Sequence, residues 1–231
     1  MKLHIFGTQA ESTPQPGCSS IAWALEKEGM IHWFDAGERC SRTAYFMGVK
    51  KEQLCRLFIS RFHPDFCSGL TGLLAGVKQI LPVYTPAENV LKCFADFFLK
   101  LDGSSIELQE QFMGKQGNAE QCGVNVSWRA AENGYIFRIE AEKRKIVYAP
   151  SAAGTEELGD WLRDPDILIW GTGKMGAVEI CRRIKHEKRH VGKLILMCHD
   201  GAGSEEDVRS KVADIFPAGV YFAEDAQTFE L

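Results

Sequence analysis

Short apolar runs rich in β-forming residues recur along the chain, with turn-forming residues between them. Runs of this kind are typical of β-strands with at least one buried face. We expect strands near residues 2–6, 19–25, 31–35, 56–60, 80–84, 124–128, 134–140, 145–149, 166–170, 194–198 and 219–223.

Other segments carry the apolar spacing of helices. Residues 87–101 place five apolar side chains on one helical face, and residues 69–77 show a similar pattern. In the last third of the chain, helices are expected over 154–164, 177–190 and 204–215. Strand-rich halves interrupted by helices, without a linker or low-complexity tract, predict a single α/β domain over residues 1–231, with helices covering packed sheets.

Composition adds few constraints. The 231 residues are 45% hydrophobic and carry a formal charge of -4, which gives no global attraction to nucleic acid. No apolar run approaches the roughly 20 residues of a membrane span, so no membrane partner is expected. The first residues go directly into a strand-like pattern, and the eight cysteines form no C-x-x-C pair. These features predict a cytoplasmic protein with reduced thiols.

The sequence GTGKMG at 171–176 spells G-x-G-x-x-G between an expected strand and an expected helix. This is the context of a dinucleotide-binding loop, which remains one alternative. However, only about sixty residues follow, too few for a second mononucleotide-binding half. A tight strand-to-helix loop is therefore the favoured interpretation.

The stretch LFISRFHPDFCSGL at 57–70 carries the candidate chemistry. A buried strand runs into a turn that holds His63 and Asp65, and strand ends of this kind often carry the ligands of metallohydrolases. The neighbouring positions hold Arg61 and Phe66, and neither side chain serves as a metal ligand. The stretch is therefore either a metal site or the remainder of one.

Seven segments, taken in order, resemble the metallo-β-lactamase fold superfamily, especially its ribonuclease Z-like and phosphodiesterase-like branch. They are FGTQAESTPQPGCSS (6–20), HWFDAGERCSR (32–42), LFISRFHPDFCSGLTGLL (57–74), GYIFRI (134–139), KIVYAPSAA (145–153), LILMCHDG (194–201) and FAEDAQTFEL (222–231). The fold implied by this resemblance is α/β: an αββα sandwich of two mixed β-sheets flanked by helices.

In that family a cleft at the strand ends holds two metal ions, usually zinc, through five histidines and two aspartates. The family's signature maps its ligands onto Arg61, His63, Asp65 and Phe66. The remaining three ligand positions map onto Trp128, Ser151 and His199. The resemblance therefore implies that His63, Asp65 and His199 are remnant metal positions, and that four ligands have been substituted. Asp35 would lie near the cleft floor.

Neither metal ion keeps a full ligand set, and a zinc site needs three or four protein ligands. The fixed charge of Arg61 would also repel a divalent cation, and we expect it to pair with Asp65 or another cleft acid. Without a metal-activated water the family's mechanism has no nucleophile. We therefore expect a protein that has lost the dinuclear site and hydrolase activity, keeps ligand binding in the cleft, and needs no cofactor.

One alternative is an active, metal-dependent phosphodiester hydrolase that uses an altered or mononuclear zinc or manganese site. Its ligands would be His63, Asp65 and His199, with Asp65 and Lys174 as the candidate catalytic residues. Lys174 falls where the branch has a histidine that helps to protonate the leaving group. The expected partner is a small-molecule or phosphodiester ligand. The basic run at 182–190 allows contact with nucleic acid, and a homodimer follows from the analogy alone.

Overall fold

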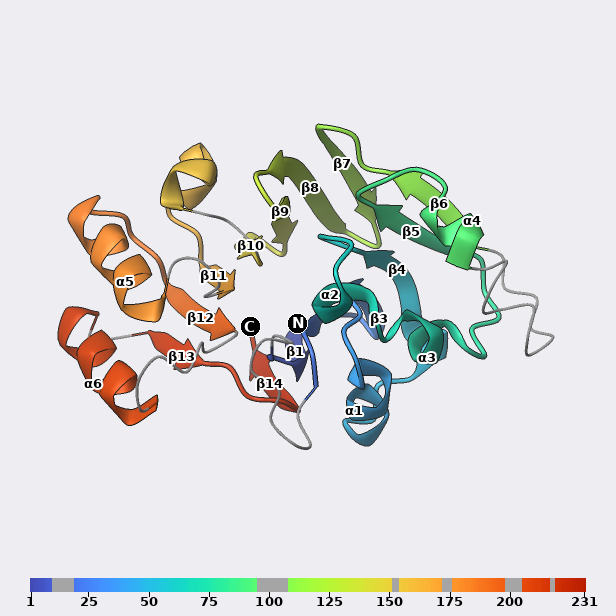
Figure 1. Cartoon of the computed structure of the whole chain (residues 1–231), viewed down its shortest axis with the longest axis horizontal. Coiled ribbons are helices and arrows are strands. Elements are labelled where there is room, and N and C mark those ends of the chain that lie inside the picture. Colours follow the sequence, from blue (N-terminus) through green and yellow to red (C-terminus); the bar gives the residue numbers. More distant parts are fainter. Residues whose placement is uncertain (10–18, 95–107, 151–153, 172–175, 198–204, 217–218) are drawn as a thin grey trace. The chain divides into compact units, whose positions relative to one another are not determined.

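The computed structural model describes residues 1–9, 19–94, 108–150, 154–171, 176–197, 205–216 and 219–231. These residues form two compact units, which are described separately. Unit 1 comprises Met1–Gly114 and Glu224–Leu231, and unit 2 comprises Lys115–Ala223. Each unit contains one seven-stranded mixed sheet with helices (Figure 1).

The sheet of unit 1 has the strand order β14-β1-β2-β3-β4-β5-β6. Its first four strands pair antiparallel and the remaining pairs are parallel. The strands are β1 (Lys2–Gly7), β2 (Ala22–Lys27), β3 (Met30–Phe34), β4 (Leu54–Phe58), β5 (Leu81–Thr85), β6 (Leu108–Phe112) and β14 (Gln227–Glu230). Because β14 pairs with β1, the first and last residues are neighbours, and the Leu231 N–H donates to the Met1 carbonyl over 3.0 Å.

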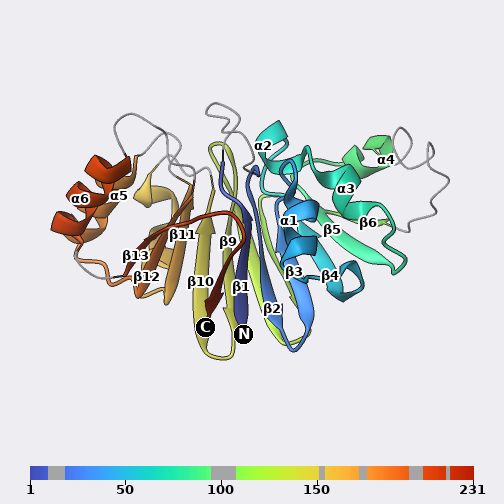
Figure 2. The same cartoon turned by 90° about the horizontal axis from the view of Figure 1, so that it is seen from below.

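Both faces of this sheet are largely buried. On one face, the stacked rings of Trp23, Phe34, Phe58 and Tyr84 run across four adjacent strands with centroid separations of 4.4, 5.1 and 4.4 Å. On the other face, apolar residues of β3 and β4 pack against helices α1 and α3 (Figure 2). The helical elements of unit 1 are α1 (Cys40–Phe46), η1 (Lys51–Gln53), α2 (Pro64–Cys67), α3 (Leu70–Leu74) and α4 (Val90–Phe94).

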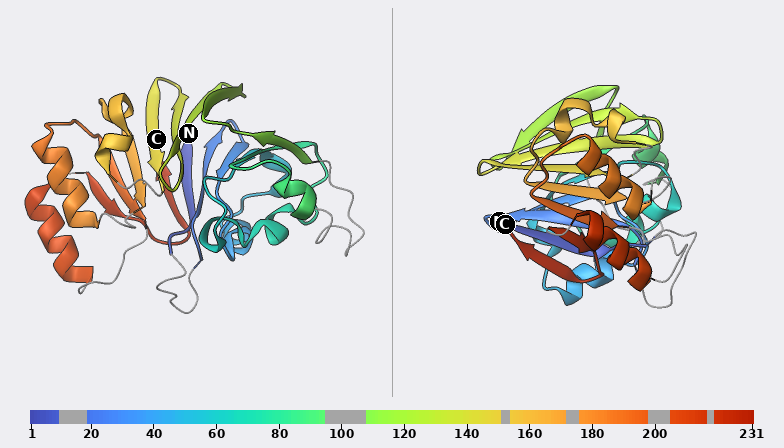
Figure 3. Two further views of the ribbon diagram at one scale, coloured as in Figure 1. Left: turned by 45° about the horizontal axis from the view of Figure 1, so that its top comes forward. Right: turned by 90° about the vertical axis from the view of Figure 1, so that its left-hand side faces the viewer.

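The sheet of unit 2 has the order β13-β12-β11-β10-β9-β8-β7, antiparallel from β7 to β10 and parallel from β10 to β13. Its strands are β7 (Gln116–Gln121), β8 (Val124–Ala131), β9 (Gly134–Ala141), β10 (Arg144–Ala149), β11 (Ile167–Gly171), β12 (Lys193–Met197) and β13 (Val220–Phe222). Helices α5 (Ala177–His186) and α6 (Glu205–Ile215) lie side by side and cover the parallel strands (Figures 1 and 3).

The predicted strands are all present, with ends that differ by a few residues. Three strands were not predicted: β6, β7 and β14. The helix expected over 154–164 is instead two 3-10 turns, η3 (Thr155–Glu157) and η4 (Gly159–Leu162). Of the helix expected over 87–101, the structure shows Val90–Phe94, and residues 95–101 lie outside the described part.

Two mixed sheets do not form the single open parallel sheet that a dinucleotide-binding loop requires. Gly171 also has a structural reason to be glycine, because a Cβ there would lie 2.1 Å from the Pro150 carbonyl oxygen. Residues 172–175 of the glycine loop are outside the described part. Among the described residues, no helix has the length and apolar character needed to cross a membrane.

Candidate functional site

The stretch that follows β4, residues 60–66, is called the signature loop below. It leads from the buried end of the strand into α2, whose first residue is Pro64. Proline suits this position because the first N–H of a helix has no intrahelical partner. His63 is the N-cap residue, and its ring nitrogen Nδ1 accepts a hydrogen bond from the Asp65 N–H over 3.4 Å. The sequence thus fixes His63 and Asp65 on one short turn.

The base of the signature loop is held by Asp35, which follows β3 and is fully buried. Its carboxylate accepts hydrogen bonds from the Ser60 N–H (2.7 Å) and the Ser60 hydroxyl (2.9 Å). The backbone of Asp35 is left-handed, with φ of 56°, and its carbonyl accepts from the Trp33 indole N–H over 2.6 Å. Asp35 is therefore a positioning residue for the loop.

Backbone hydrogen bonds also connect the segment that follows β3 with the end of the signature loop and the residues just after it. The Ala36 N–H donates to the Phe66 carbonyl over 2.7 Å, and the Gly69 N–H donates to the Ala36 carbonyl over 2.8 Å. A Cβ on Gly37 would lie only 2.5 Å from the Asp65 carbonyl oxygen, so a side chain cannot be accommodated there. The glycine of the segment HWFDAGERCSR thus permits a close backbone approach.

His63 and Asp65 also form a side-chain contact, with Nδ1 of His63 3.4 Å from Oδ2 of Asp65. Asp65 is buried, whereas the His63 side chain is 38% exposed. The expected ion pair between Arg61 and Asp65 is absent from the part of the chain that the structure describes, where the His63 ring contacts the Asp65 carboxylate. Arg61 itself is partly exposed.

Phe66, which the resemblance aligns with the signature's last histidine, is only 5% exposed. The His63 ring meets it edge-on, with centroids 6.3 Å apart. A buried phenyl ring supplies no metal ligand, and Arg61 adds a fixed positive charge to the same loop. Among the described residues, no three His, Cys, Asp or Glu side chains gather to form a metal site. The loop's own residues therefore do not fit the dinuclear zinc centre.

Of the remaining candidate positions, only Trp128 belongs to the residues that the structure describes. Trp128 is a buried mid-strand residue of β8 in unit 2, where Gly117 on β7 leaves room for its indole ring. Ser151, Lys174 and His199 lie outside the described residues. Their expected convergence with the signature loop thus stays a prediction.

A second anchor in unit 1 was not predicted. The Asp225 carboxylate accepts hydrogen bonds from the Thr8 N–H (3.0 Å), the Thr8 hydroxyl (3.1 Å) and the Ser19 N–H (2.5 Å). Burial raises the pKa of the Asp225 carboxyl, although the hydrogen bonds from Ser19 and Thr8 oppose the shift. Asp225 thereby ties the C-terminal segment to two residues that lie eleven positions apart in the sequence.

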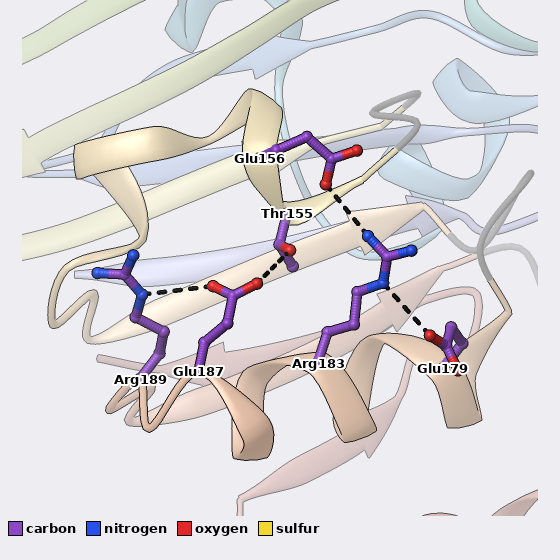
Figure 4. Close-up of polar contacts among 6 residues, drawn as sticks. All are labelled: Thr155, Glu156, Glu179, Arg183, Glu187 and Arg189. Atoms are coloured by element: carbon purple, nitrogen blue, oxygen red, sulfur yellow. Dashed lines mark hydrogen bonds and ion pairs between the residues drawn. The ribbon is translucent and has the colours of Figure 1, made fainter.

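The basic run at 182–190 is partly neutralised by acids of its own unit (Figure 4). Arg183 contacts Glu156 over 3.1 Å and Glu179 over 3.3 Å. Glu187 accepts hydrogen bonds from the Thr155 hydroxyl over 2.7 Å and from Arg189 over 3.4 Å. The Arg183–Glu156 pair connects α5 to η3, and the Thr155–Glu187 hydrogen bond connects η3 to the residue that follows α5, which gives these charges a structural role. Contact with nucleic acid stays a prediction.

The partial exposure of Arg61 leads to a stability prediction. Arg61→Ala should lower the free energy of unfolding by less than about 1 kcal/mol, because a water-accessible cation without a buried partner contributes little. Phe66→Ala on the same loop should cost about 3–5 kcal/mol, since it empties a buried site. Urea denaturation measures both. A loss near 3 kcal/mol for Arg61→Ala would instead reveal a buried ion pair.

Comparison with known proteins identifies the fold. The structure resembles the metallo-β-lactamase fold protein YhfI from Bacillus subtilis with a TM-score of 0.81 and 16% identity, over 99% of both chains. The chain thus has the metallo-β-lactamase fold, as the sequence predicted. No family model matches the sequence.

Within that fold, the sequence is similar to ribonuclease Z. It is 37% identical over 168 residues to ribonuclease Z of Nitrosopumilus maritimus, covering 65% of this chain and 56% of that protein. It is 27% identical over 207 residues to ribonuclease Z of Nostoc punctiforme, covering 80% of this chain and 65% of that protein. The chain therefore spans less than two thirds of the length of these relatives.

Proposed function

We propose that this chain is a ribonuclease Z-like protein that has lost the dinuclear metal site and metal-dependent hydrolysis, and that it binds an anionic ligand beside Arg61. The observation that carries the proposal is the pair of substitutions on the signature loop. A cation and a buried phenyl ring stand where the resemblance implies two histidine ligands. Without a metal to lower the pKa of water, the loop supplies no hydrolytic nucleophile.

The remaining chemistry suits binding of an anion. A guanidinium presents donors in a planar fork that matches phosphate or carboxylate oxygens, and Arg61 is partly exposed. Asp35 holds Ser60 at the start of the loop that carries it, and the Ala36 N–H donates to the Phe66 carbonyl at its end. A phosphodiester or a smaller anionic molecule is therefore the ligand that this loop favours. A cytoplasmic location and a homodimer are further expectations of the proposal.

The test is metal content followed by activity. Protein purified without chelators should contain far less than stoichiometric zinc or manganese. It should hydrolyse bis(p-nitrophenyl) phosphate no faster than the metal-containing buffer alone. Stoichiometric zinc together with metal-dependent hydrolysis would overturn the proposal.

Restoring ligands gives a sharper prediction. The double variant Arg61→His/Phe66→His should bind zinc at least about tenfold more tightly than the parent, or about 1.4 kcal/mol. Arg61→Gln/Phe66→Leu is the matched control, because it removes the same two side chains without adding a ligand. Competition with a zinc-binding dye measures both affinities. Equal zinc affinity in the two double variants would show that the loop does not face a metal position.

The similarity to ribonuclease Z supports a second candidate, a hydrolase that works with one metal ion. His63 and Asp65 are kept and lie on one turn, and this candidate also needs His199. Hydrolysis that requires added zinc or manganese, and that disappears in both His63→Ala and Asp65→Asn, would favour it over the first proposal.

A further inference from the structure

Unit 1 contains a cavity of about 500 Å³ on the helix-covered side of its sheet. Its apolar wall comes from Ile31, Trp33, Ala44, Leu54 and Leu73, which belong to β3, α1, β4 and α3. Ligand pockets in proteins fall in this size range and have mainly apolar walls with a few polar groups.

The cavity is separate from the signature loop. Leu54, which lines it, is the first residue of β4, whereas the loop begins beyond Phe58, the last residue of that strand. Trp33, which pairs with Leu57 of β4, is the part of the wall nearest to the loop, and none of residues 60–66 lines the cavity. A ligand in the cavity would therefore not compete directly with one at Arg61.

Charge at the cavity's edge indicates the kind of ligand. Lys51 lines the cavity, and its ammonium group donates to the Gly72 carbonyl over 2.7 Å and to the Ala75 carbonyl over 2.5 Å. Partial burial lowers the pKa of Lys51, although nearby Cys40 and Glu52 oppose the shift. Both hydrogen-bonded partners are neutral, so an anionic group placed beside this ammonium would offset its desolvation.

The other charges at the edge of the cavity limit how many negative groups the bound anion can carry. Lys50 adds a second positive charge, and Glu52, which also lines the cavity, is an exposed acid. A ligand with two or more negative groups would meet Glu52 at close range, whereas a single anionic group can lie on the lysine side. We propose that the cavity binds a small organic monoanion, with an aromatic or aliphatic body against the apolar wall and a carboxylate or sulfonate at Lys51.

The cavity is connected to the signature loop through two successive hydrogen-bonded contacts. Trp33 lines the cavity, and its indole N–H donates to the Asp35 carbonyl over 2.6 Å. The Asp35 carboxylate in turn holds Ser60, the first residue of the signature loop. A ligand in contact with Trp33 would therefore touch a residue that is hydrogen-bonded to Asp35, and Asp35 holds the signature loop.

The experiment uses 8-anilinonaphthalene-1-sulfonate, an apolar aromatic monoanion, as the probe, with binding followed by fluorescence and calorimetry on the full chain. The parent should bind it saturably at one site. Val49→Trp, which fills the cavity from the loop after α1, should weaken binding at least tenfold. Lys51→Met, which keeps the apolar stem, should weaken binding several-fold while leaving the neutral analogue N-phenyl-1-naphthylamine unaffected.

Phe46→Ser is the matched control. Phe46 is 72% exposed and does not line the cavity, although its ring meets edge-on that of Tyr45, which does, so the probe could adhere to Phe46 without entering. Binding that survives Phe46→Ser but falls in Val49→Trp and Lys51→Met supports the proposal. Binding that is lost in Phe46→Ser, or that is unchanged in both cavity variants, overturns it. Lys51→Met keeps the test decisive if Val49→Trp does not fold.

Discussion

Asp35→Ala should lower the free energy of unfolding by about 3–5 kcal/mol. The substitution leaves the buried Ser60 N–H and hydroxyl without the carboxylate to which they donate. A buried donor that loses its acceptor costs about 1–3 kcal/mol, and hydrogen bonds to a charged group are the stronger kind. Alanine also adopts the left-handed backbone of residue 35 at a cost of about 1–2 kcal/mol. Urea denaturation of parent and variant measures the difference.

Asp35→Asn separates these contributions. Asparagine tolerates the left-handed backbone, its amide oxygen can accept from the Ser60 N–H, and the Ser60 hydroxyl can turn to accept from its amide group. We expect this variant to retain most of the stability that Asp35→Ala loses. Ligand binding at Arg61 should weaken in Asp35→Ala, because the base of the loop is no longer held. If both variants match the parent, Asp35 does not position the loop.

The strands that were predicted from the sequence are more buried than the three that were not. The three strands that were not predicted, β6, β7 and β14, all lie at sheet edges, and none contains a buried residue. An edge strand in which no face is fully buried needs no apolar alternation, so LQEQF, QGNAEQ and QTFE give little hydrophobic signal. The fourth edge strand, β13, ends in the buried Phe222 and was predicted.

Within the candidate site, the sequence predicted only the contacts between residues that are close together along the chain. His63 and Asp65 lie two residues apart on a turn that begins with proline, so their proximity follows from the sequence. The anchoring of Ser60 by Asp35 joins residues 25 positions apart, and the link from Thr8 and Ser19 to Asp225 spans more than 200. Such pairs depend on strand order, which one sequence does not reveal. The ion pair expected between Arg61 and Asp65 is not present among the described residues, where the Asp65 carboxylate contacts the His63 ring.

The largest dependence on pH is expected from His32 in β3. This ring is fully buried, and its Nδ1 accepts a hydrogen bond from Nε of the equally buried Arg56 over 2.8 Å. Burial, the charge of Arg56 and that of Lys27 lower the pKa of His32 to about 3 from an ordinary value of 6.5. A proton on Nδ1 would remove the acceptor and place a second positive charge beside the guanidinium. The folded protein therefore holds His32 neutral.

The direction of the pH effect on stability follows from the pKa of His32 in the folded and in the unfolded chain. Between pH 6.5 and about 3 the unfolded chain binds a proton at His32 that the folded chain does not. Stability from this group is therefore complete above pH 6.5 and falls by about 1.4 kcal/mol for each pH unit below it. His32→Gln is the matched variant, because its amide oxygen can accept from Arg56 and does not titrate. The difference in unfolding free energy between parent and variant should change with that slope from pH 6 to pH 4, measured by urea denaturation. Parallel stability curves would show that His32 is protonated in the fold.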